Sequence, residues 1–74
     1  MKNKGVKLKI FLKKGELRTE VWEKLNEPKT ATDIAKELRK HRSAISRVLL
    51  DMERGGFVKC VNPEDKSFRH YVKR

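Results

Sequence analysis

The most informative polar residues lie near the middle of the chain, where two arginines and two serines are spaced for one side of a helix. They are Arg42, Ser43, Ser46 and Arg47. A guanidinium group presents a fork of N–H donors that fits guanine O6 and N7 or the oxygens of a phosphate. Serine is short enough to let a helix approach its ligand closely, and the first turn of a helix offers free N–H groups to an anion. This pattern predicts binding to nucleic acid. The simpler alternative is a solvated helix surface on which Ser43 is the N-cap.

The other polar residues show no spacing for a catalytic triad, a phosphate loop or a carboxylate pair, so we expect no enzymatic activity. Cys60, His41 and His70 are the only classical soft metal ligands in the sequence. Pairing within a hairpin would bring Cys60 close to His70, but one cysteine and one histidine fall short of a four-ligand zinc site. We therefore expect a buried cysteine, a surface histidine, and neither a metal nor a cofactor.

The charge balance indicates a polyanionic partner. The 74 residues include 20 Lys+Arg and 10 Asp+Glu, which gives a formal net charge of +10. Residues 1–14 hold six lysines and no acid, residues 15–54 are nearly balanced, and residues 55–74 are basic again. Such an excess attracts DNA, RNA or an anionic lipid surface, unless it only covers a solvated exterior. The length limits the chain to one small domain and excludes a large enzyme with its own cofactor domain.

The sequence also favours a cytoplasmic protein without a membrane segment. No stretch approaches the roughly 18 apolar residues of a membrane span. Lysines interrupt the apolar residues of 6–12, and no small-residue cleavage site follows, so we expect no secretory signal. The single cysteine cannot form an internal disulfide, which suits a reducing compartment.

Hydrophobic periodicity divides the chain into a basic N-terminal arm or strand over 1–14 and a domain over 15–74. Residues 6–12 alternate between apolar residues and lysines, with Phe11 as the exception. This period of two predicts a short strand, with a helix as the alternative. From Leu17 the period becomes helical and predicts a helix over 16–25, which ends before a proline.

Two further helices and a hairpin follow. A helix is predicted over 32–39, where Thr30 and Asp33 have the spacing of a capping box and Thr32 is an equally good N-cap. The next helix is predicted over 42–54, and two glycines end it. Its core face is formed by four apolar residues, Ile45, Val48, Leu49 and Met52. Strands over 57–61 and 68–72, with a polar turn over 62–67, complete an α+β fold of three helices and a C-terminal hairpin.

The sequence from Thr30 to Val72 resembles the winged helix-turn-helix regulators of archaea and bacteria, of the broad MarR/ArsR-like type. The resemblance covers roughly residues 17–74. Its matching pieces are the helix beginning after Thr30, the segment His41-Arg-Ser-Ala-Ile-Ser-Arg47, the segment from Met52 to Val58, and the hairpin as wing. The resemblance implies that helix 42–54 lies in the major groove of double-stranded DNA and that hairpin 57–72 approaches phosphate or the minor groove.

The residues expected to contact DNA are Arg42, Ser43, Ser46, Arg47, Lys40, His41, Thr32, Lys66, Ser67 and Arg69. The resemblance alone implies the last three. Two features depart from the family pattern. A basic turn over 39–41 stands where a glycine followed by an apolar residue is common, and Leu50 stands where a charged residue is usual. We interpret Leu50 as an ordinary surface leucine.

These observations predict a sequence-specific, double-stranded-DNA-binding transcriptional regulator that acts as a homodimer, with no identifiable small-molecule effector. The N-terminal strand and helix 16–25 are the candidate dimer elements. Two alternatives stay open. One is a sequence-independent DNA- or RNA-binding protein, and the other is a winged-helix module that binds only protein.

Overall fold

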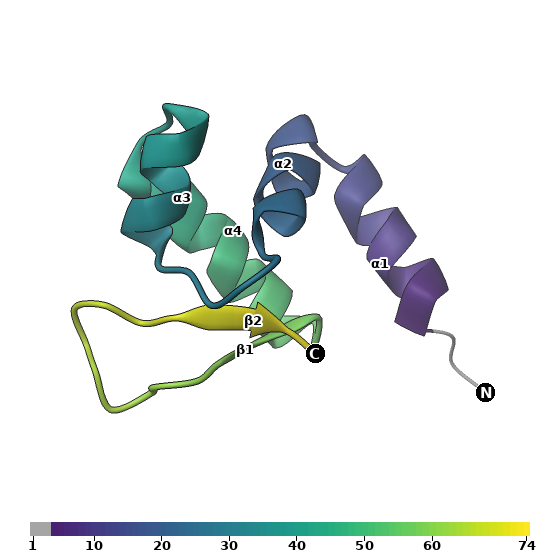
Figure 1. Ribbon diagram of the computed structural model, residues 1–74. Helices are drawn as coiled ribbons and strands as arrows, with labels where there is room; N and C mark the ends of the chain where they lie inside the picture. Colours follow the sequence, from purple (N-terminus) through teal and green to yellow (C-terminus); the bar gives the residue numbers. More distant parts are fainter. Residues whose placement is uncertain (1–3) are drawn as a thin grey trace.

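The computed structural model describes residues 4–74 and shows an α+β fold, with four helices followed by an antiparallel hairpin over that range (Figure 1). The elements are α1 (Lys4–Lys13), α2 (Glu16–Lys24), α3 (Ala31–Leu38), α4 (Arg42–Arg54), β1 (Val58–Cys60) and β2 (Tyr71–Lys73). Residues 1–3 of the basic N-terminal segment lie outside the described part. The predicted bounds of α2, α3 and α4 agree with the structure to within one residue at each end.

The strand predicted over 6–12 is wrong, because this segment is the helix α1. A helix places Leu8, Phe11 and Leu12 on one face, at positions i, i+3 and i+4, whereas a strand would put Phe11 and Leu12 on opposite faces. All three side chains pack against the core, and the ring of Phe11 lies 5.3 Å from that of Phe57. The period of two in the lysines is therefore misleading, and the described chain has four helices instead of three.

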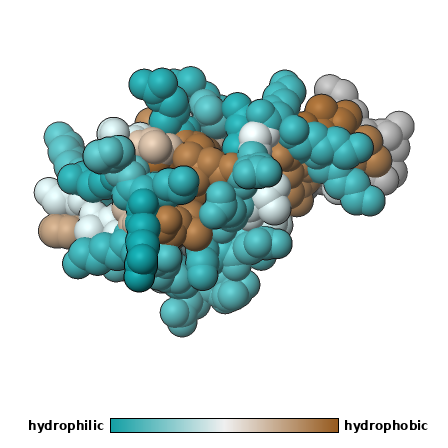
Figure 2. Space-filling model, turned by 90° about the horizontal axis from the view of Figure 1, so that it is seen from above, coloured by the Kyte–Doolittle hydropathy of each residue, from teal (hydrophilic) through white to brown (hydrophobic). Residues whose placement is uncertain are grey.

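The outer side of α1 carries two exposed apolar residues beside its exposed lysines. Figure 2 shows hydrophobic surface at the end of the molecule that α1 forms, next to a mostly hydrophilic face. Val6 and Ile10, one helical turn apart, are 51% and 55% exposed. Single exposed apolar residues are common, but a pair on one helical face is a candidate contact surface.

The core lies between α2, α3, α4 and the hairpin. Helices α3 and α4 pack against each other, and the apolar face predicted for α4 is buried, which confirms that prediction. The helix ends at Arg54, as predicted from the two glycines. Gly56 has φ +78°, a left-handed conformation that glycine adopts without a Cβ clash. Burying such a face typically stabilises a fold by about 1.5–3 kcal/mol for each large apolar side chain.

The start of α3 has a reciprocal cap. The hydroxyl of Thr30 accepts the Asp33 N–H at 3.0 Å, and the Asp33 carboxylate accepts the Thr30 N–H at 3.1 Å. The predicted capping box is thus confirmed, and of the two candidate N-caps it is Thr30, not Thr32. These bonds to Thr30 lower the pKa of the Asp33 carboxyl. At the other end, Arg39 adopts the left-handed conformation with φ 55° and turns the chain toward α4.

The hairpin is shorter than predicted, because only residues 58–60 and 71–73 form strands, with Cys60 opposite Tyr71. Its connecting segment, the hairpin loop (residues 61–70), includes residues 68–70, which were predicted to be strand. The backbone of Tyr71 also pairs with Lys29, through N–H to carbonyl bonds of 2.9 and 3.2 Å. This long-range pairing holds the hairpin beside the segment that leads into α3, which brings the hairpin loop close to the start of α3 (Figure 1).

Within the described residues, no helix has both the length and the apolar character needed to cross a membrane.

Candidate nucleic-acid interface

Helix α4 carries four of the expected site residues at its N-terminal end, on the side away from the core. Arg42, Ser43 and Arg47 are exposed, and Ser46 is half-buried. The N-cap is His41, whose side chain makes no capping hydrogen bond, so the alternative role of Ser43 as N-cap is wrong. The first turn of α4 has no acidic residue. Free N–H groups and two guanidinium groups therefore share one surface, an arrangement that favours anions.

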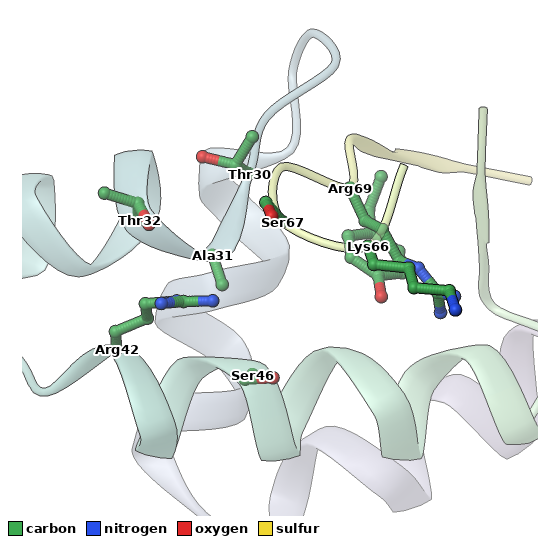
Figure 3. A pocket seen from close by; sticks show the side chains of 9 residues that line it. Thr30, Ala31, Thr32, Arg42, Ser46, Lys66, Ser67 and Arg69 are labelled. Atoms are coloured by element: carbon green, nitrogen blue, oxygen red, sulfur yellow. The ribbon is translucent and has the colours of Figure 1, made fainter. Parts of the chain in front are cut away.

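A small pocket of about 70 Å³ lies between the start of α3, the side of α4 and the hairpin loop (Figure 3). We call it the basic pocket, and its lining residues are Thr30, Ala31, Thr32, Arg42, Ser46, Lys66, Ser67, Arg69 and Tyr71. The lining has three cationic side chains, five hydroxyl-bearing ones and no carboxylate. Six of the ten expected site residues, from three separate stretches of sequence, meet here.

The cations of the basic pocket come from two elements. In Figure 3, Arg42 extends from α4 toward Ala31 at the start of α3, while Lys66 and Arg69 extend from the hairpin loop in a common direction, away from Arg42. Among residues 4–74, none of these three side chains forms an ion pair within 4.0 Å. Three like charges without an acid repel one another, so an anion bound between them lowers the electrostatic energy of the pocket.

The hydroxyl groups of the pocket differ in what they offer. Thr30 already accepts the Asp33 N–H, so its oxygen is part of the helix cap. Tyr71 is a buried residue, and this burial raises the pKa of its phenol. The phenol O–H is able to donate a hydrogen bond.

The remaining expected residues lie beside the pocket. Ser43 and Arg47 line a shallow hollow along α4, whose lining is Ser43, Ser46, Arg47, Leu50, Asp51 and Arg54. Asp51 is the only acid there, and its carboxylate lies 3.9 Å from the guanidinium of Arg18. Lys40 and His41 are exposed in the turn before α4 and do not line the basic pocket. Leu50 is 39% exposed on the rim of this surface.

Three pocket residues are absent from the expected set: Thr30, Ala31 and Tyr71. The sequence carries a signal for Thr30, because an N-cap necessarily lies at the start of its helix. No local pattern indicates Tyr71, since its position depends on backbone pairing with Lys29, 42 residues earlier in the chain.

The side chain of Asn62 contacts both Cys60 and His70. The thiol of Cys60 lies 3.5 Å from Asn62 Oδ1, and the Asn62 amide nitrogen lies 3.4 Å from His70 Nδ1. Both residues are half-buried, which differs from the expected buried cysteine and surface histidine. Over residues 4–74, no three His, Cys, Asp or Glu side chains are grouped as a metal site.

No protein-family model, curated protein or solved structure matches this chain. The functional interpretation therefore depends on the contacts and charges of the chain itself.

Proposed function

We propose that this protein is a sequence-specific, double-stranded-DNA-binding transcriptional regulator with a winged helix-turn-helix fold. Helix α4 lies in the major groove and the hairpin is the wing. The observation that carries the proposal is the convergence of the exposed start of α4 and the hairpin loop on one basic pocket without a carboxylate. The proposed activity is binding, with no catalytic step.

The order and packing of the elements support the fold assignment. Helices α3 and α4 pack together and are joined by a short turn over residues 39–41, the arrangement of a helix-turn-helix. The hairpin follows α4 directly and is anchored to the start of α3 through Tyr71 and Lys29. In a helix-turn-helix, the N-terminal residues of the second helix contact base edges while the first helix crosses the backbone.

The proposal assigns separate tasks to the two surfaces. Arg47 and Ser43, along the exposed side of α4, contact base edges, where an arginine recognises guanine through two parallel hydrogen bonds. The basic pocket holds a backbone phosphate between Arg42, Lys66 and Arg69, and this contact sets the register of α4 in the groove. The lysines elsewhere on the surface add sequence-independent affinity through release of counterions.

We further propose that the functional form is a homodimer that joins through α1. One such module buries a small interface on DNA and offers limited specificity. Val6 and Ile10 form an exposed apolar pair on α1, away from the basic pocket, and a second copy would cover it. A two-fold dimer predicts a palindromic site, with half-sites about 34 Å apart, or one helical turn.

The experiment is selection from a pool of random duplex DNA, followed by competition between the selected site and an excess of random duplex. We expect the selected site to survive competition. The variant R42A/R47A should bind it at least about 30-fold more weakly, because it removes both the guanine contact of Arg47, worth about 1–3 kcal/mol, and the phosphate contact of Arg42. The matched control is K36A/K59A, which removes two positive charges from exposed positions outside the basic pocket. It should lose only a small part of the affinity.

Two results would contradict the proposal. If random duplex displaces the selected site equally well, the protein binds nucleic acid without reading sequence. If the wild type binds no duplex at all, the surface serves a protein partner. Equal losses in R42A/R47A and K36A/K59A would show that only net charge matters and that α4 does not enter the groove.

A further inference from the structure

Phe68 has an exposed aromatic ring, and side-chain hydrogen bonds fix both its backbone N–H and its carbonyl. The ring belongs to a residue that is 56% exposed. Its N–H donates to Asp65 Oδ1 at 2.8 Å, and its carbonyl accepts a hydrogen bond from the Asn62 amide, also at 2.8 Å. Side chains thus satisfy both backbone polar groups of Phe68, although no β-ladder passes through this residue.

The same two side chains also bond the backbone of two other residues in the hairpin loop. Asp65 also accepts the Ser67 N–H at 2.8 Å, and Asn62 Oδ1 accepts the His70 N–H at 2.7 Å. The backbone carbonyl of Asp65 accepts a bond from the Arg69 side chain at 3.1 Å. A ring carried by a loop with this many bonds is already oriented, so it loses little conformational freedom when it meets a partner.

The neighbours of Phe68 indicate the chemistry of that partner. Lys66 and Ser67 precede it, Arg69 follows it, and all three line the basic pocket. Phe68 therefore belongs to a segment whose neighbouring side chains line the surface proposed to bind a polyanion. Val61 is the other exposed large apolar residue of the hairpin. Like Phe68 it does not line the pocket, but unlike Phe68 it has no cationic residue beside it in the sequence.

Resting on the proposed function, we propose that Phe68 is a wedge that enters the minor groove, partly unstacks one base step and bends the bound duplex. Proteins that insert apolar side chains in this way kink DNA by roughly 20–90°. Lys66 and Arg69 favour this placement, because the minor groove has a negative potential that attracts cationic side chains. Pyrimidine–purine steps, above all TA, are the sites that open most easily.

The test uses a 30-base-pair duplex that contains the selected site, with 2-aminopurine at a pyrimidine–purine step beside the wing and a fluorophore pair at its ends. On binding of the wild type we expect 2-aminopurine fluorescence to rise at least twofold and energy transfer between the ends to increase. At protein concentrations that saturate the duplex, the variant F68A should lose both signals. F68L, which keeps an apolar side chain, should retain part of each. The matched control V61A removes an exposed apolar side chain from the same hairpin and should behave as the wild type.

The outcomes separate the wedge from the proposed function. If the wild type binds the duplex with neither signal, or if F68A keeps both, the wedge is wrong and DNA binding stands. If the wild type binds no duplex, the proposed function fails first. If F68A weakens binding only to a single-stranded oligonucleotide of the same sequence, the ring stacks on unpaired bases, and the wedge is overturned. Thermal unfolding of each variant shows that it is folded.

Discussion

The guanidinium of Arg18 lies over the ring of Phe11, with its central carbon 4.2 Å from the ring centroid. One of its nitrogens also donates to the Phe11 carbonyl at 3.2 Å, and the other lies 3.9 Å from Asp51. Arg18 therefore joins three helices, α1, α2 and α4, from a half-buried position. The basic segment at the N-terminus is held against the domain by this contact and by the ring pair of Phe11 with Phe57.

The contact predicts that R18A lowers the free energy of unfolding by about 1–2 kcal/mol, because it removes a cation–π contact and a hydrogen bond. R18K, which keeps the charge without the planar group, should recover less than half of the loss. The measurement is urea unfolding followed by circular dichroism, with K13A as an exposed control on α1. Equal stability of R18A and K13A would show that the contact contributes nothing.

The capping box predicts a difference between two threonines. T30A should destabilise the protein by about 1–2 kcal/mol, since it leaves an N–H of α3 without its side-chain acceptor, and T30S should restore most of the stability. T32A should change the stability by less than about 0.5 kcal/mol. Thr32 lines the basic pocket, so its variant should affect DNA binding more than unfolding. A larger stability loss in T32A than in T30A would reverse the assignment of the cap.

The lowered pKa values of two carboxyl groups predict that the protein loses stability in acid. Hydrogen bonds from the backbone of Thr30 lower the pKa of Asp33, and those from Phe68 and Ser67 lower the pKa of Asp65, both from an ordinary value of 3.8. A carboxyl group whose pKa is lower in the folded than in the unfolded protein stabilises the fold. This stabilisation is complete when the pH is above the pKa of the unfolded protein. The stabilisation is lost as the pH falls through the folded-state pKa.

We therefore expect the melting temperature to fall in acid solutions below about pH 4. D33N and D65N should each show a shallower fall, and the double variant the shallowest. Thermal unfolding between pH 2 and 6, read by circular dichroism, provides the measurement. If the melting temperature falls equally steeply in acid for both variants and the wild type, other carboxylates cause the loss of stability.

The turn before α4 predicts a stabilising substitution. Arg39 is the only non-glycine residue among the described ones with a positive φ, and this conformation costs an ordinary residue about 1–2 kcal/mol. Glycine adopts this conformation without that cost, although its greater conformational entropy in the unfolded chain offsets part of the gain in stability. R39G should therefore raise the free energy of unfolding by about 0.5–1 kcal/mol, while K40G in the same turn should lower it. A destabilised R39G would mean that the arginine side chain has a contact that offsets its backbone strain.

The apolar pair on α1 predicts the oligomeric state. Sedimentation of the wild type at increasing concentration should show a monomer that passes into a dimer. I10E should stay monomeric, because the substitution would bury a charge in the contact. Ile10 is exposed in the single chain, so the variant should keep its melting temperature when dilute. A wild type that stays monomeric at every concentration would exclude the dimer.

Local patterns in the amino-acid sequence were sufficient for much of the fold. The spacing of Ile45, Val48, Leu49 and Met52 predicted both α4 and its buried face, since burial of one apolar stripe is a property of the helix itself. The capping box of Thr30 and Asp33 is equally local, because its partners are three residues apart. The arginines and serines of α4 could be placed on its outer side for the same reason.

Long-range contacts decided the rest. The segment over 6–12 suits a strand by its alternating lysines and a helix by its apolar triad, and only packing of Phe11 against Phe57 and Arg18 selects the helix. The basic pocket joins residues more than thirty positions apart, and the hairpin loop reaches it because Tyr71 pairs with Lys29. Helical periodicity and capping involve residues only a few positions apart, so the sequence is sufficient to predict them. That Arg42, Lys66 and Arg69 line one pocket depends on how whole elements pack, which no local pattern specifies.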